Sequence, residues 1–290
     1  MTGDLSFSAR QRLLLIPVYT LLVMAAALTL VPFIWMACAA FKGNADFFSS
    51  VFLPRGDGFL GIAWDRLTVV NFKRLFTELS IGNALLNSFF LSSVSAIAAT
   101  LCSAAGGYAL AKFRFAGRGF VLNLVLVALV IPGPLLMAPG YQLIYKLGLL
   151  DTYAGLILPG VAPAFGIFLF RQATMNAIPH ELLESARIDG AGELRIFFTL
   201  VLPLLRPMIG AFLMITFLGT WNNFIGPQII LQSPELFPLS VAINQLRGLY
   251  GQDYGMIMSG TLVSIAPVLC LFLLLQKEFI AGLTSGAVKG

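Results

Sequence analysis

The chain has 290 residues, of which 58% are hydrophobic and only 11% are charged, against about 25% charged residues in soluble domains. Together with a mean hydropathy of +0.90, this composition excludes an ordinary water-soluble domain and indicates that lipid is the natural solvent. The formal net charge of +5 comes without a lysine-rich run, so it does not predict nucleic-acid binding.

Long apolar runs dominate the chain, and a helix needs roughly 20 such residues to cross a bilayer. About six runs meet this length: residues 13–37, 84–111, 120–138, 153–170, 207–225 and 256–275. The first is too long for a signal-peptide core, so we expect an uncleaved anchor. The sequence predicts an all-α integral membrane protein with six transmembrane helices in one domain, residues 1–290.

The predicted spans contain no Asp, Glu, Lys, Arg or His. An ionisable side chain in the bilayer costs at least about 2.5 kcal/mol and usually marks an ion-coupling site. This composition argues against a proton- or sodium-driven transporter.

Basic residues between the spans predict the orientation. Lys112, Arg114 and Arg118 crowd the second link, whereas the link over residues 139–152 holds only Lys146. Positive links face the cytoplasm, so an even number of spans places both termini there. Residues 171–206 then form a cytoplasmic loop, residues 226–255 an external loop, and residues 276–290 a cytoplasmic tail.

Residues able to carry catalysis or bind metals are sparse in the sequence. Cys38, Cys102, Cys270 and the single histidine, His180, have spacings that fit neither a zinc site nor a disulfide framework. The sequence has no phosphate-binding Gly-x-x-x-x-Gly-Lys-Ser/Thr loop, and its spans hold no nucleophile or paired carboxylates. We expect a chain without catalytic residues, metal or cofactor, and ATP and magnesium in a partner subunit.

The loop over residues 171–206 predicts two short amphipathic helices. Pro179 suits a helix start, and Leu182, Leu183 and Ala186 form an apolar stripe. Gly190 should end the first helix because glycine readily adopts a positive φ, and Pro203 should end or kink the second. A plain amphipathic hairpin lying on the bilayer is the structural alternative.

This loop resembles the EAA loop of binding-protein-dependent permeases, whose pattern is Glu-Ala-Ala, three residues, Gly, nine residues, Ile, one residue, Leu-Pro. The matching residues are Glu184, Ser185, Ala186, Gly190, Leu200, Leu202 and Pro203. Ser185 and Leu200 depart from the pattern but are similar in size to the usual residues. The resemblance implies a coupling helix that docks in a cleft of an ATPase subunit, with the fold of type I ABC importers.

The C-terminal tail resembles that of the smaller permease of maltose-type carbohydrate ABC importers, where it reaches between two ATPase subunits. The contacts that this resemblance implies are Gly282, Leu283, Thr284, Ser285 and Gly286. The alternative is a loose, solvated chain end.

Two further segments carry the same resemblance, Asn87-Ser88 and Trp221-Asn-Asn-Phe224. Asn87, Trp221, Asn222 and Asn223 could line the translocation path, or could serve only as hydrogen-bonding groups between helices. By resemblance, the external loop would enter the sugar cleft of a binding protein, with Tyr250, Gln252 and Asp253 as contacts. A solvated turn would favour the same residue types.

The resemblance therefore implies a permease subunit in the inner membrane of a bacterium, importing a carbohydrate by alternating access. Its expected partners are a second, homologous permease, an ATPase dimer, an external solute-binding protein and the lipid bilayer. The alternatives are a secondary transporter or channel for a polar solute, and a membrane-embedded enzyme.

Overall fold

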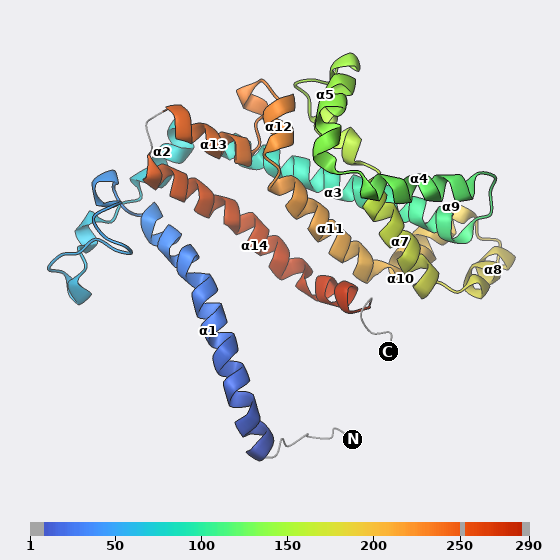
Figure 1. Ribbon diagram of the computed structural model, residues 1–290, viewed down its shortest axis with the longest axis horizontal. Helices are drawn as coiled ribbons and strands as arrows, with labels where there is room; N and C mark the ends of the chain where they lie inside the picture. The colour runs from blue at the N-terminus through green and yellow to red at the C-terminus, as the bar shows by residue number, and fades with distance from the viewer. Residues whose placement is uncertain (1–8, 250–252, 286–290) are drawn as a thin grey trace. The chain divides into compact units, whose positions relative to one another are not determined.

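The computed structural model describes residues 9–249 and 253–285, and most of this backbone is helical (Figure 1). Two compact units are present, Met1–Leu79 with Leu246–Val263, and Ser80–Gln245 with Ser264–Gly290. The α-helices are α1 (Ala9–Ala40), α2 (Val70–Glu78), α3 (Ile81–Lys112), α4 (Arg118–Val130), α5 (Met137–Lys146), α6 (Tyr153–Ile157), α7 (Ala164–Ala177), α8 (His180–Ile188), α9 (Glu193–Ile196), α10 (Leu202–Leu204), α11 (Arg206–Trp221), α12 (Ile225–Ile230), α13 (Leu239–Leu249) and α14 (Tyr254–Ser285).

Three helical segments among the described residues are long and apolar enough to cross a membrane: Leu15–Ala40, Ile81–Lys112 and Tyr254–Lys277. The helices that hold these segments, α1, α3 and α14, contain the first, second and sixth predicted spans, which are confirmed as continuous helices. Three further helix pairs reach the required length and hydropathy only when each bent pair is taken as one span. The count of six spans therefore stays a prediction.

The prediction of one continuous helix over residues 120–138 is wrong. Helix α4 ends at Val130, and the segment Gly133–Lys146 leaves at 104° to it. The cause is local, because Pro132 and Pro134 lack the backbone N–H that would continue the helix.

The fourth predicted span is also interrupted. The axis bends by 41° between Tyr153–Gly160 and Ala164–Ala177, where Pro159 and Pro163 stand in the sequence. A second bend, of 81°, lies between Glu193–Leu204 and Arg206–Trp221, just before the start of the fifth predicted span. The fifth predicted run, residues 207–225, loses its helix at Trp221.

The second unit is built on α3, which packs mainly against α7 and α11. Gly107 permits the closest approach, since a Cβ placed there would lie 2.6 Å from the backbone nitrogen of Arg171. Gly166 does the same on α7, where a Cβ would lie 2.3 Å from the Ser103 hydroxyl. Small residues matter here because lipid supplies no hydrophobic force to join helices, so close packing must do so.

The first unit contains α1, the long first loop and the beginning of α14. Within the first loop, Val70–Glu78 form the short amphipathic helix α2. The side-chain amide of Asn71 donates to the carbonyls of Ala40 and Lys42, both at 2.8 Å. These bonds satisfy carbonyls at the end of α1 that have no partner within the helix.

The loop over residues 226–255 contains more helix than the sequence indicated. We expected a loop there, but most of α12 and the eleven-residue α13 lie within it. Phe237, Leu239 and Val241 are buried there, so an apolar face that packs inward accounts for the unpredicted helix.

Candidate functional site

The loop with the EAA-type pattern folds as a helical hairpin, with α8 and α9 on either side of Gly190. Pro179 stands at the N-cap of α8, and Glu181 lies in the first turn, where a negative charge favours the helix dipole. At the other end Gly190 has φ +81. Its N–H bonds the carbonyl of Arg187 at 3.0 Å, and the N–H of Ala191 bonds that of Ala186 at 3.0 Å. This is the glycine-terminated helix end that the sequence predicted.

The inner face of the hairpin belongs to the core of the second unit. Leu183 on α8 and Ile196 on α9 are fully buried. They join a cluster that includes Tyr108 of α3, Phe170 of α7 and Phe212 of α11. Truncating such a side chain to alanine typically costs about 2–5 kcal/mol, so the hairpin is firmly attached to these helices.

The outer face of the hairpin exposes two large apolar side chains, Ile188 at 86% and Leu194 at 76%. Among the EAA-type residues, Glu184, Ser185 and Gly190 are exposed, whereas Ala186 packs partly against the core. The structure therefore places one side of the motif on a free surface and the other side on the helices below.

The C-terminal part of the motif lies where the chain turns into α11. Residues Phe197–Val201 form a π-helical turn, in which the Leu202 N–H reaches the Phe197 carbonyl. Pro203 cannot donate the next bond, which explains a local departure from α-helical pairing. Leu200 and Leu202 pack against the core, and Pro203 is exposed.

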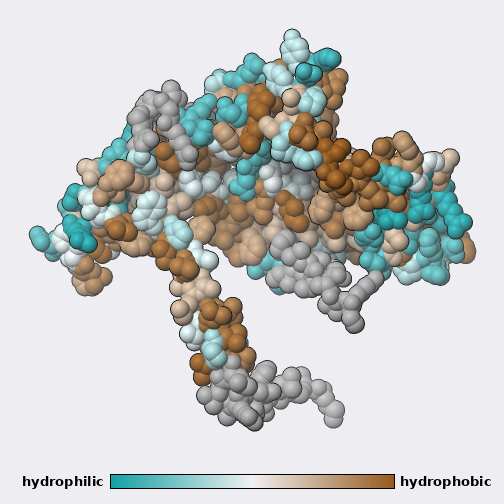
Figure 2. All heavy atoms as spheres, viewed as in Figure 1, coloured by the Kyte–Doolittle hydropathy of each residue, from teal (hydrophilic) through white to brown (hydrophobic). Residues whose placement is uncertain are grey.

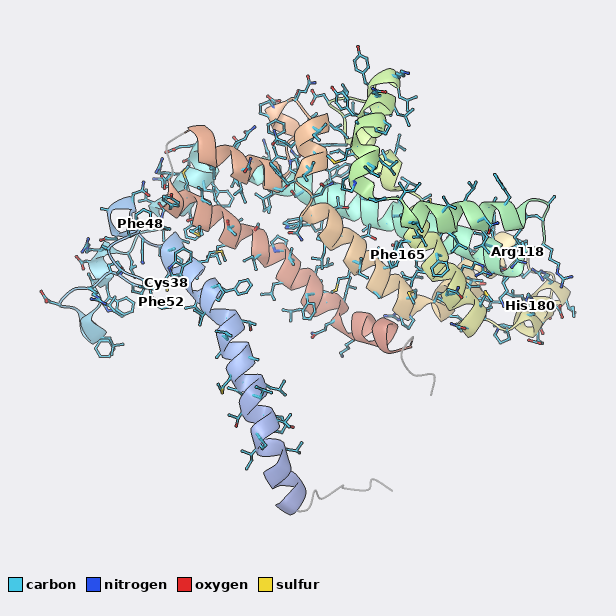
Figure 3. The ribbon with its side chains drawn as sticks, in the orientation of Figure 1. Cys38, Phe48, Phe52, Arg118, Phe165 and His180 are labelled. Carbon is cyan, nitrogen blue, oxygen red and sulfur yellow. The ribbon has the colours of Figure 1, made fainter. Side chains whose placement is uncertain are left out.

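Polar contacts tie the hairpin region to the ends of neighbouring helices. The Lys112 ammonium donates to the carbonyl of Ile178, just before α8. The Arg118 guanidinium donates to the carbonyl of Leu110 at 2.9 Å, at the end of α3. Figure 3 places Arg118 and His180 at the same end of this unit. The basic residues used to predict the cytoplasmic side thus gather around the hairpin.

A separate cavity of about 310 Å³ lies among α3, α7 and α11. Its polar lining consists of Ser88, Ser95, Thr216, Thr220 and Asn223. Phe165 of α7, labelled in Figure 3, contributes an aromatic ring that is half exposed. Hydroxyl and amide groups beside an aromatic face suit a neutral, hydroxyl-rich ligand.

Of the predicted path residues, Asn223 alone lines this cavity. Its side-chain oxygen accepts from the Gly226 N–H at 3.2 Å. Trp221 is buried and stacks on Phe217 at a centroid distance of 5.6 Å, and the Asn222 amide donates to the carbonyl of Leu218 at 2.9 Å.

Asn87 forms hydrogen bonds to another part of the chain, as in the alternative under which these residues only join helices to one another. Its amide donates to the carbonyls of Glu235 at 2.7 Å and Phe237 at 3.1 Å. This residue therefore attaches the loop before α13 to the first turns of α3.

The predicted binding-protein contacts are only partly described. Tyr250 and Gln252 lie outside the described residues. Asp253 is buried, with its carboxylate 2.7 Å from the Arg74 guanidinium and 3.2 Å from the Met256 N–H. These contacts give Asp253 a structural role in the first unit. For the predicted tail contacts, the backbone of residues 282–285 continues α14, and Gly286 lies outside the described residues.

Sequence reasoning missed a contact between two loops. The carboxylate of Asp151 accepts hydrogen bonds from the N–H of Gln232 at 2.8 Å, from the N–H of Ser233 at 2.9 Å, and from the Ser233 hydroxyl. These bonds lower the pKa of Asp151, the hydroxyl contributing most. Asp151 and its partners are about 80 residues apart in the sequence, so no local sequence pattern predicts this contact.

These features define a class, an all-α membrane protein with a helical hairpin packed on α3, α7 and α11. In the described residues, no group of three or more His, Cys, Asp or Glu side chains is placed to hold a metal ion. The chain belongs to the family of binding-protein-dependent transport system inner membrane components, whose pattern matches residues 102–276. It is thus a transport subunit of an inner membrane and not an enzyme.

Two curated relatives support this assignment. The arabinooligosaccharides transport system permease protein AraQ of Halalkalibacterium halodurans is 41% identical over 225 residues, covering 77% of this chain and 80% of the relative. The lactose transport system permease protein LacG of Rhizobium radiobacter is 34% identical over 280 residues, covering 97% and 98% of the two chains.

A solved structure supports the fold. A chain of a bacterial ABC transporter involved in the import of the acidic polysaccharide alginate aligns with a TM-score of 0.79 at 21% identity, covering 94% of this chain and 99% of that chain. The fold is therefore that of an ABC importer permease.

Proposed function

We propose that this chain is one of two related permease subunits of an ATP-driven importer that carries an oligosaccharide into the cytoplasm. A separate ATPase dimer would bind ATP and magnesium, and an external binding protein would deliver the substrate. Relatives named for arabinooligosaccharides and lactose support the carbohydrate class.

The observation that carries the proposal is the two-sided hairpin around Gly190. Its inner side is fixed to α3, α7 and α11 through Leu183 and Ile196, and its outer side exposes Ile188 and Leu194. Exposed apolar side chains on a rigid base are typical of an interaction site. An ATPase bound to that outer face could move three spanning helices together.

The proposed orientation follows from the charges around the hairpin. Lys112 and Arg118 contact backbone at this end of the unit, and positive residues favour the cytoplasmic side. In this orientation both termini are cytoplasmic, and the tail over residues 282–286 reaches the ATPase subunits as well. Closure of the ATPase dimer would then draw the hairpins together and open the path outward, and hydrolysis would reset it.

We further propose that the substrate touches this subunit at the cavity around Thr216, Thr220 and Phe165. The volume of about 310 Å³ falls in the range of small-molecule sites. The hydroxyl groups can exchange hydrogen bonds with sugar hydroxyls, while the phenylalanine ring covers an apolar sugar face.

The test uses two substitutions at Gly190 in the assembled transporter. No heavy atom lies within 4 Å of a Cβ built there, so a side chain would project outward without disturbing the core. Gly190→Asn preserves the left-handed backbone, which asparagine tolerates, whereas Gly190→Trp adds both strain and bulk. We expect Gly190→Trp to abolish uptake and substrate-stimulated ATP hydrolysis while the protein remains inserted.

Gly190→Asn should retain more activity than Gly190→Trp, because it adds less bulk at the docking surface. Normal uptake by Gly190→Trp would contradict the coupling role. Uptake that continues without an ATPase subunit but collapses with the ion gradient would favour a secondary transporter instead.

A further inference from the structure

Several polar groups of the loop after α1 are bonded within the loop. The Lys42 ammonium is buried and donates to the carbonyls of Ser50 at 2.6 Å and Val51 at 3.2 Å. Arg66 forms an ion pair with Asp46, and the Trp64 indole N–H donates to the carbonyl of Phe59 at 3.0 Å. Isolated β-bridges join Lys42 to Leu67 and Arg55 to Ile62. The loop is therefore a folded element with its own internal bonding.

The same loop directs its largest apolar side chains outward. Phe59 is 78% exposed and Leu60 is 75% exposed, and Phe48, Val51 and Trp64 are also exposed. Leu60 has φ +62 and Gly61 has φ +69, so the tightest turn carries a leucine where glycine or asparagine is usual. Large apolar side chains exposed together call for an apolar neighbour.

The contacts and exposure within the first unit favour the lipid bilayer as the neighbour of these apolar side chains. The loop begins directly after α1, whose side chains from Ile16 to Ile34 are largely exposed within the unit, as expected for a lipid-facing span. Figure 2 shows hydrophobic residues along this helix. The ring of Phe47 contacts Trp35, in the last turns of α1, at a centroid distance of 6.0 Å, and the ring of Phe48 lies 5.0 Å from that of Phe47. The apolar side chains of the loop thus begin in contact with the end of α1.

We propose that the exposed face of residues 48–64 lies in the headgroup region of the bilayer and anchors this end of α1 to lipid. Phenylalanine and tryptophan rings favour this interfacial layer, which is apolar on one side and wet on the other. The polar residues Arg55, Asp57 and Asp65, which are exposed in the same loop, remain in water. The anchor fixes the depth of the first span independently of any partner subunit.

The experiment compares two neighbouring positions in the full chain, assembled with its partner subunits in phospholipid nanodiscs. After Cys38, Cys102 and Cys270 are replaced by alanine, Phe59→Cys and the control Asp57→Cys are labelled with an environment-sensitive fluorophore. Quenching is then measured with a lipid carrying a nitroxide near its headgroup and with aqueous iodide.

At Phe59→Cys we expect lipid nitroxide to quench about threefold more than iodide, and at Asp57→Cys the reverse, because only the first side chain would lie in the interface. Equal iodide quenching at both positions would place the loop in water and overturn the proposal. Protection of Phe59→Cys from both quenchers would also overturn it, in favour of a protein partner. Val51→Cys with Asp65→Cys provides a second pair should Phe59→Cys fail to assemble.

Discussion

The guanidinium of Arg187 lies 2.7 Å from the carboxylate of Glu193, and this ion pair joins α8 to α9 across Gly190. The Tyr108 hydroxyl lies 3.4 Å from the same carboxylate. Tyr108 of α3 therefore contacts the ion pair that joins α8 to α9, which links the hairpin to α3.

Reversing one charge of this pair should loosen the hairpin, and reversing both should restore it. Because both side chains are more than a third exposed, Arg187→Glu or Glu193→Arg alone should cost no more than about 1 kcal/mol of stability. Limited proteolysis of the hairpin and uptake by the transporter would measure the change. Recovery in the double variant is expected, and additive losses would contradict a direct contact.

The same pair should give no titration step in uptake between about pH 6 and pH 9. The hydrogen bond to Glu193 raises the pKa of Arg187 above its ordinary value. The stabilisation is complete below the ordinary arginine pKa and is lost only as pH rises through the raised value. A step that disappears in Arg187→Gln would show that the pair titrates.

Replacing Gly107 should disturb the packing of α3 on α7. In Gly107→Ala the new Cβ would lie 2.6 Å from the Arg171 backbone nitrogen and 2.7 Å from the Phe170 Cβ. The two helices must move apart, which should lower the free energy of unfolding by about 1–3 kcal/mol. The loss would be measured as a lower melting temperature of the purified transporter.

Gly106→Ala is the matched control for this substitution. Its Cβ would meet Ile167 at 3.5 Å, an ordinary contact, and alanine favours a helix by about 1 kcal/mol over glycine. We expect a melting temperature equal to or above that of the unmodified chain. Equal losses in both variants would contradict the close crossing at Gly107.

Asp151 should hold the loop at Ser233 down to unusually low pH. Hydrogen bonds from the Ser233 hydroxyl and from the N–H groups of Ser233 and Gln232 lower the pKa of Asp151 below 3.8. Because the folded value is depressed, the stabilisation is present above the ordinary pKa and is lost as pH falls through the lowered one.

Hydrogen exchange of the Gln232 and Ser233 amides would measure this contact. We expect protection at neutral pH that weakens only under strongly acidic conditions, and loss of that protection at neutral pH in Asp151→Ala. Ser233→Ala, which removes the hydroxyl bond alone, should retain part of the protection. Unchanged exchange in Asp151→Ala would contradict the contact.

Removing one hydroxyl from the cavity should weaken transport without uncoupling the ATPase. Thr220→Val preserves the shape of the side chain but removes a hydrogen bond to a sugar, typically worth about 1 kcal/mol. The substrate concentration for half-maximal uptake should rise about fivefold. Thr77→Val is a suitable control, because its hydroxyl bonds the Lys73 carbonyl on α2, in the unit that does not contain the cavity. Equal effects of both variants would argue against substrate in the cavity.

The sequence predicted the elements whose causes are local. Apolar length located α1, α3 and α14, and the glycine at position 190 located the end of α8. The bend after α4 follows from Pro132 and Pro134, which are visible in the sequence, but the apolar run hid their effect. Hydropathy indicates how long an apolar segment is. Whether that segment forms one straight helix depends also on backbone N–H groups, which proline lacks.

The parts of the site that depend on distant residues could not be predicted. Asn87 matched a family motif, yet the structure shows its amide bonded to carbonyls about 150 residues away. Asp253 was expected as a loop contact for a partner, but Arg74, 179 residues away, pairs with its carboxylate. The cavity combines residues of α3, α6, α7, α11 and α12, and the packing of α3, α7 and α11 depends on Gly107 and Gly166. Such contacts arise from packing and leave no periodic signal.

Site-directed crosslinking at the exposed tip of the hairpin tests the coupling role most directly. In a transporter assembled with its ATPase, Ile188→Cys should form a crosslink to the ATPase subunit, whereas Leu147→Cys, exposed after α5, should not. A crosslink from Leu147→Cys, or none from Ile188→Cys and Leu194→Cys in an assembled complex, would contradict docking of the hairpin on the motor.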